Sequence, residues 1–128
     1  MYQRSADGGK TWSASNTGAS VAVSSAVWAS ADDNQLLLLG TPTKGVLRST
    51  DGGRQWADSS EGMSLFVRSL AIDPDAAARV YAASLGGGLF RSDDGAAQWR
   101  NLGLSDRNIF DVQALGQGRV LAGTSVGV

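Results

Sequence analysis

A recurring turn is the feature that most constrains the fold of this chain. Its three copies are the segments "YQRSADGGKTW" (2–12), "VLRSTDGGRQW" (46–56) and "LFRSDDGAAQW" (89–99). Ser5, Ser49 and Ser92 hold the same place in the copies and lie 44 and 43 residues apart. A period of this length is typical of a four-stranded propeller blade and of some two-helix repeats, so the content of one repeat decides the fold.

Strand signals distinguish between these two kinds of repeat. In the middle copy, strands are expected at 66–73, 79–84, 89–92 and 98–102, separated by the Asp-Pro-Asp turn, three consecutive glycines and the "DDGAA" turn. The other copies align, with first strands at 22–30 and 109–115 and second strands at 36–41 and 119–124. Four short strands per repeat predict a propeller blade, and the continuous apolar runs predict strands covered on both faces.

The ends of the chain divide one repeat. The last copy begins at Ile109 and reaches Val128 after its second strand, whereas the chain starts at a third strand. We therefore expect an all-β chain, a β-propeller of four-stranded blades with three blade-equivalents. Its units are an outer half blade (1–18), two blades (22–62 and 66–105) and an inner half blade (109–128), so that one blade is split between the N- and C-termini.

Composition excludes several classes of function. The 128 residues are 42% hydrophobic and 18% charged, which argues against disorder, and a formal charge of −1 gives no support to nucleic-acid binding. Cysteine and histidine are both absent, which removes thiol catalysis, serine–histidine catalysis and the usual zinc sites. The longest apolar run, Leu36 to Leu39, is too short to span a membrane. We expect no metal and no cofactor.

The recurring turn resembles the Asp-box, or BNR-repeat, motif Ser-x-Asp-x-Gly-x-Thr-Trp. This family includes sialidases, some xyloglucan-degrading glycoside hydrolases, sortilin-type receptor domains and photosystem assembly-factor propellers. The matching residues are Ser5, Asp7, Gly9, Thr11 and Trp12 in the first copy, Ser49, Asp51, Gly53 and Trp56 in the second, and Ser92, Asp94 and Trp99 in the third. Gln55 replaces the threonine, and Ala96 replaces the third glycine, so we expect the third copy to turn less tightly.

The motif residues are interpreted as scaffold. An aspartate can accept hydrogen bonds from amides that follow it in a hairpin, a glycine can supply a positive φ, and a tryptophan can cover the turn. The alternative, calcium binding, has weak support because each copy offers one or two carboxylates where calcium takes about six to eight oxygens. Arg4, Arg48 and Arg91 each precede the motif serine, which indicates a repeated packing or salt-bridge role.

Catalysis by this chain is a minority interpretation, and we assign no catalytic residue. Most glycosidases need two facing carboxylates, and the resemblance to sialidases implies an arginine triad, a tyrosine nucleophile and a paired glutamate. Glu61 is the only glutamate, and Tyr2 and Tyr81 lie within expected strands. An aspartate pair brought together by folding stays open.

A ligand is expected where each blade's last strand leads into the next blade. This face would carry segments 16–20, 61–64 and 105–108, together with residues near the mouth of the channel. The candidate binding residues are Lys44, Glu61, Arg68, Asp106, Arg107, Asn108 and Asp111. The ligand would be a protein or a glycan, and solvated loop charges are the alternative interpretation.

The complementary half blades predict self-association. Propeller rings contain roughly four to eight blades, so three repeats are too few to close a ring. A head-to-tail homo-oligomer would complete the split blade, with six blades from two chains or nine from three, and we favour the dimer. The alternative is a truncated piece of a longer propeller of this family.

Overall fold

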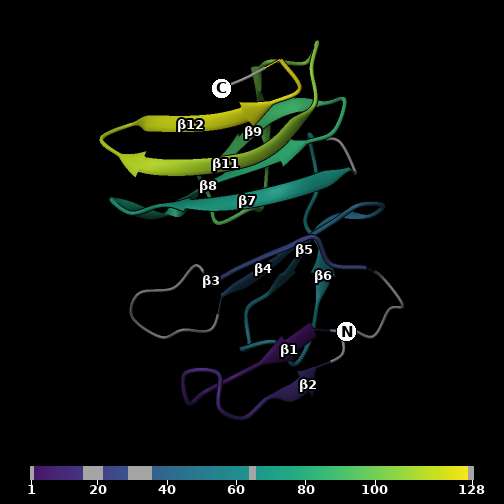
Figure 1. Cartoon of the computed structure of the whole chain (residues 1–128), viewed down its shortest axis with the longest axis vertical. Coiled ribbons are helices and arrows are strands. Elements are labelled where there is room, and N and C mark those ends of the chain that lie inside the picture. Colours follow the sequence, from purple (N-terminus) through teal and green to yellow (C-terminus); the bar gives the residue numbers. More distant parts are fainter. Residues whose placement is uncertain (1, 16–21, 29–35, 64–65, 127–128) are drawn as a thin grey trace.

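The computed structural model describes residues 2–15, 22–28, 36–63 and 66–126. These residues form antiparallel sheets that follow one another along the chain (Figure 1). The first sheet contains β1 (Tyr2–Arg4) and β2 (Ser13–Ser15), and the second contains β3 (Ser25–Trp28), β4 (Leu37–Thr41), β5 (Gly45–Ser49) and β6 (Ala57–Asp58). The third contains β7 (Val67–Asp73), β8 (Ala76–Ser84), β9 (Gly88–Ser92) and β10 (Arg100–Gly103), and the last contains β11 (Ile109–Gly116) and β12 (Arg119–Thr124).

Both complete sheets have the simple strand order in which each strand pairs with the next. Their registers are also equivalent, because Leu37 lies opposite Ser49 and Val80 lies opposite Ser92. The described residues include no helix, and hence none that could cross a membrane. The predicted all-β chain with four-stranded sheets is therefore confirmed.

The sheets stack along the long axis of the molecule, with β1 and β2 at one end and β11 and β12 at the other (Figure 1). A first apolar cluster joins the second and third sheets, where Leu38 and Val46 meet Val67, Val80 and Phe90. A second cluster joins the third sheet to β11, through Tyr81, Ala83, Leu89, Ile109 and Val112. Neighbouring sheets thus share a core, as blades do.

Strand β8 shows why the second strands have continuous apolar runs. Val80 and Ala82 belong to the first cluster, whereas Tyr81 and Ala83 belong to the second. Successive side chains of a strand point to opposite faces, so the part of β8 that lies between the two cores, from Val80 to Ser84, buries every residue. The alternating pattern of a one-sided sheet is accordingly missing here.

Among the described residues, each of the two end sheets has another sheet on one side only. Along β12, Val120 and Ala122 pack against the second cluster, whereas Leu121, which points the other way, is 47% exposed. Phe110 and Leu115 of β11 are also exposed. A face of large apolar side chains is therefore open at this end of the stack.

Several strand limits differ from the sequence-based expectation, and β3, for example, begins at Ser25 instead of Ala22. Strand β8 begins at Ala76 instead of Arg79, because the backbone pairs immediately after the Asp-Pro-Asp turn, where Asp73 lies opposite Ala76. Strand β10 begins at Arg100, and Trp99 precedes it with its side chain in the core.

Candidate functional site

The three recurrent turns (residues 5–12, 49–56 and 92–99) share one hydrogen-bond pattern. In the first, the hydroxyl of Ser5 donates to Asp7 at 2.8 Å, and the amide of Gly9 donates back to the Ser5 oxygen at 2.8 Å. The Asp7 carboxylate also accepts from the amides of Lys10 and Thr11, at 3.0 and 2.9 Å. The aspartate therefore holds the turn by capping amides that the hairpin leaves unpaired.

The second and third turns repeat this pattern. Asp51 accepts from the Ser49 hydroxyl at 2.8 Å and from the Gln55 amide at 2.9 Å. Asp94 accepts from the Ser92 hydroxyl at 2.7 Å and from the Gln98 amide at 3.0 Å. A glutamine can replace the threonine because the backbone amide, and not the side chain, makes the repeated contact.

The expectation that the third turn is looser is wrong. Ala96 adopts a φ of 76°, close to the 90° of Gly9 and the 96° of Gly53 at the same place. Its amide donates to the Ser92 hydroxyl oxygen at 2.9 Å, as the glycine amides do. The side-chain contacts of the turn impose the left-handed backbone, and the alanine methyl is fully buried in the first cluster.

The three tryptophans differ in what they cover. The indole N–H of Trp12 donates to the Gly9 carbonyl at 3.0 Å, and Trp56 makes the equivalent bond to Gly53 at 3.1 Å. Trp99 instead donates to the carbonyl of Ser59 in the preceding sheet at 2.7 Å and is buried. The third tryptophan therefore joins two sheets, a role that the motif alone does not indicate.

Hydrogen bonding keeps the turn aspartates ionised. The side chain and amide of Thr11, followed by Ser5, lower the pKa of Asp7 to about 2. Hydrogen bonds from the backbone amides of Gln55 and Gln98 are the main causes that lower the pKa of Asp51 and of Asp94, respectively. A general acid must hold a proton at the working pH, so these carboxylates are unsuited to that role near neutrality.

The recurring arginines connect successive sheets. Arg4 Nη1 donates to the Gly52 carbonyl at 3.3 Å, and Arg48 Nε donates to the Gly95 carbonyl at 2.9 Å. Each acceptor lies in the recurrent turn of the next sheet. Arg91, in the last of the three copies, donates to Asp93 at 2.8 Å.

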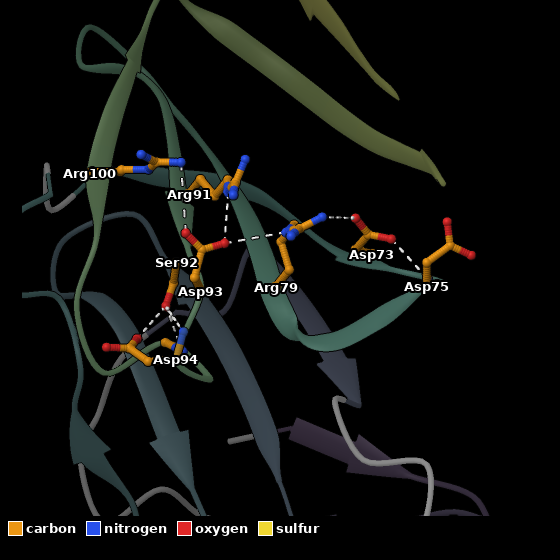
Figure 2. A network of polar contacts seen from close by, with 9 residues as sticks. Asp73, Asp75, Arg79, Arg91, Ser92, Asp93, Asp94 and Arg100 are labelled. Carbon is orange, nitrogen blue, oxygen red and sulfur yellow. Dashed lines mark hydrogen bonds and ion pairs between the residues drawn. The ribbon is translucent and has the colours of Figure 1, made fainter. Parts of the chain in front are cut away.

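An ion-pair network surrounds Asp93, and the sequence indicated only Arg91 among its members (Figure 2). Three guanidinium groups point toward this carboxylate, from Arg79 at 3.3 Å, Arg91 at 2.8 Å and Arg100 at 3.8 Å. Arg79 also contacts the buried Asp73 at 3.2 Å. Arg91 is the main cause that lowers the pKa of Asp93. The network ties the β7–β8 turn to the third recurrent turn, and the pairing of β9 with both β8 and β10 brings these charges together.

The candidate binding residues lie along one edge of the stack of sheets, where the strands end in turns, and in the first strands next to this edge. Lys44 lies in the β4–β5 turn and Glu61 after β6, and the Ser60 hydroxyl between them donates to the Lys44 carbonyl at 3.3 Å. Arg68 lies in β7 and is exposed. Segment 16–20 and residue 64, which belong to the same expectation, lie outside the described residues.

The β10–β11 turn contains the candidates Asp106, Arg107 and Asn108, and Asp111 follows in β11. Asp106 and Arg107 form a two-pronged ion pair at 2.9 and 2.8 Å, and this contact lowers the pKa of Asp106. The Asn108 carbonyl accepts from the Ser125 amide at 3.0 Å, which joins this turn to the end of β12. The Asp111 carboxylate is positioned by the Ser69 hydroxyl at 2.8 Å.

Two hollows lie at opposite ends of the stack. One, of about 410 Å³, runs along β12 and is lined by Leu104, Arg107, Leu121 and Val126 among others. The other, of about 190 Å³ and mostly apolar, lies between β1 and the second sheet and is lined by Ala26, Leu37 and Leu39 among others. Within the described part of the chain, no group of three or more acidic side chains could hold a metal ion.

Two solved structures contain a similar arrangement of sheets. An ancestral GH74 enzyme aligns with 85% of the chain at 23% identity and a TM-score of 0.68, and YCF48 bound to D1 peptide aligns with 84% at 17% identity and a TM-score of 0.66. The chain has a β-propeller fold. It spans 14% of the length of the first protein and 35% of the second, so its open sheets correspond to part of a propeller. No family model and no curated protein matches the sequence.

Proposed function

We propose that this chain is a non-enzymatic binding and scaffold module of the Asp-box propeller class, and that two chains join head to tail into a six-bladed ring. The observation that supports this proposal is that, in the part of the chain that the structure describes, the first and last sheets, β1–β2 and β11–β12, each contain two strands instead of four. Within the described residues, β1 pairs with β2 alone and β12 pairs with β11 alone, so each of these strands has a partner strand on one side only. Open edges of this kind pair readily with another chain.

Membership of the Asp-box class is supported by the recurrent turns. All three have the same serine–aspartate pair and the same bonds to backbone amides. The shared propeller fold of two solved structures is compatible with this assignment. The aspartates and tryptophans of these turns are scaffold residues in this proposal.

A peptide or protein is the ligand that we favour. The neighbour YCF48 is bound to D1 peptide, so a propeller of this type can take a peptide. In the present chain, the ligand would contact the edge that carries the candidate residues Lys44, Glu61, Arg68, Asp106, Arg107, Asn108 and Asp111. Mixed charges at this edge favour a peptide that also carries both signs.

Sedimentation velocity and mass photometry test the assembly. We expect a species of twice the 13.2 kDa chain mass, in a concentration-dependent equilibrium with the single chain. A well-folded chain that stays at 13.2 kDa at every concentration would contradict the ring and would favour a piece of a longer propeller. A peptide array then tests the ligand, with Lys44→Ala and Arg107→Ala expected to weaken any peptide that binds.

The second candidate function is a carbohydrate-active propeller, which the likeness to a GH74 enzyme supports. In this case the ring would bring copies of Arg68, Asp106, Arg107 and Asp111 around one channel. A glycan array and a panel of fluorogenic glycosides test this function. Absence of both glycan binding and glycoside hydrolysis would exclude it. If hydrolysis occurs, Asp111→Asn is expected to abolish it, and full activity of that variant would exclude Asp111 as the reacting carboxylate.

A further inference from the structure

One polar contact repeats between the first strands of successive sheets. The amide of Leu70 donates to the Ser25 hydroxyl at 3.1 Å, and the amide of Val112 donates to the Ser69 hydroxyl at 3.4 Å. Ser25 and Ser69 hold the same place in the strand register, and Asp111 holds it in β11. Each first strand thus offers a side-chain oxygen to the next sheet, and in the last sheet this oxygen belongs to an exposed carboxylate.

The arginine contact repeats in the same direction. Arg4 and Arg48 reach the carbonyls of Gly52 and Gly95, which lie 48 and 47 residues further along the chain. Arg91 holds the same place in β9, where its Nε donates to Asp93 of the same chain. In the first recurrent turn, the residue equivalent to Gly52 and Gly95 is Gly8, which also has a positive φ of 73°.

An apolar contact completes the pattern. Leu38 and Tyr81 occupy equivalent places in β4 and β8, and each is buried against the next sheet. The equivalent residue of β12 is Leu121, whose side chain is 47% exposed. At the other end of the stack, the hollow lined by Ala26 and Leu37 is the matching recess.

These repeats define two complementary surfaces. The C-terminal face is defined by Arg91, Asp111 and Leu121. The N-terminal face is defined by Gly8, Ala26 and the hollow beside Ala26. Building on the head-to-tail assembly proposed above, we infer that the C-terminal face docks on the N-terminal face of a second copy by repeating all three contacts. Arg91 then donates to the Gly8 carbonyl of that copy, Asp111 accepts from its Ala26 amide, and Leu121 enters its hollow.

The same equivalence sets the strand register across the junction. In the complete sheets, Leu39 lies opposite Leu47 and Ala82 lies opposite Phe90. By the same spacing, β12 of one chain pairs with β1 of the other so that Ala122 lies opposite Gln3. A second copy is the favoured occupant because it supplies the pairing strand, the carbonyl and the amide at the spacing that the complete sheets use.

A cysteine cross-link tests this register in the full chain, which has no cysteine of its own. The variant Gln3→Cys/Ala122→Cys places two thiols directly opposite each other, on one face of the ladder. Mild oxidation is expected to give a covalent dimer on a non-reducing gel. The control variant Gln3→Cys/Leu121→Cys puts the thiols on opposite faces, because successive side chains alternate, and is expected to stay unlinked.

Substitution of the polar groups tests the contacts. Arg91→Ala and Asp111→Ala each remove a junction hydrogen bond that involves a charged group, in addition to the bond with Asp93 or Ser69 of the same chain. Loss of the junction bond weakens one junction about tenfold or more. A ring of two chains contains two junctions, so the dimer dissociation constant is expected to rise about a hundredfold or more. Arg54→Ala is the matched control, because Arg54 is exposed and takes part in none of the three contacts, and it should leave that constant unchanged.

The outcomes separate this inference from the proposal on which it rests. If the parent chain is a monomer at every concentration, the assembly fails and the junction fails with it. If the parent dimerises, but the Gln3/Ala122 pair does not cross-link or Arg91→Ala dimerises as the parent does, the assembly stands and the inferred junction is overturned. Cross-linking of the matched pair alone, together with the expected loss of affinity, supports it.

Discussion

Leu38→Ala tests the idea that stability comes from the cores between sheets. Leu38 is fully buried, and its side chain belongs to the cluster that joins the second and third sheets. Truncation of such a leucine removes its burial and leaves a cavity, which costs about 3–5 kcal/mol. For a chain of this size, each kcal/mol shifts the melting temperature by about 3 °C, so a drop of about 10 °C or more is expected.

Leu121→Ala is the matched control for this variant, because Leu121 occupies the equivalent place in β12 but is 47% exposed. In the single chain the substitution should cost about 1 kcal/mol or less. Both variants should be compared by urea unfolding at protein concentrations where mass photometry finds the single chain. A cost below about 1 kcal/mol for Leu38→Ala, or equal costs for both variants, would refute this account of the core.

Other substitutions probe the contacts between sheets, the turns and the glycines. Arg48→Ala should lower the free energy of unfolding by about 1.5 kcal/mol in urea titrations, since it loses the bond to the next turn, whereas the exposed Arg54→Ala should change it by less than about 0.5 kcal/mol. Folding lowers the pKa of Asp7 to about 2, so its stabilising contribution is complete above the ordinary pKa of 3.8 and is lost as the pH falls toward 2. Acid titrations followed by tryptophan fluorescence should therefore show a smaller loss of stability in Asp7→Asn than in the parent. Gly62→Ala should destabilise by about 2 kcal/mol or more, because φ is 90° and the new methyl would collide with a backbone carbonyl of the third recurrent turn. Gly118→Ala has a φ of 73° but open space, and a melting curve should show a loss of only about 1 kcal/mol.

The recurrent turn was readable from the sequence because its physics is local. Ser5, Asp7 and Gly9 lie within five residues of one another, and their bonds connect neighbours in the chain. The strand and turn signals within each repeat then set the strand count of each sheet. The same local logic misjudged Ala96, since a residue type alone does not show that surrounding bonds can impose a positive φ on it.

Sites that depend on the approach of distant segments were less predictable. The motif does not reveal that the indole of Trp99 donates to Ser59, next to the preceding sheet, whereas the indole of Trp12 donates to Gly9 within its own turn. The charges around Asp93 come from β8, β9 and β10, and of these only Arg91 is distinguished in the sequence, by its place before the motif serine.

The sequence by itself determined the all-β class, the repeat and its period, and the turns that end each hairpin, because turn chemistry and strand patterns act over a few residues. The tertiary structure alone decided how the sheets contact one another: which arginine reaches which carbonyl, which face of β12 is open, and where the hollows lie. Those features depend on the packing of segments more than forty residues apart, whose relative positions follow from the twist and stacking of whole sheets.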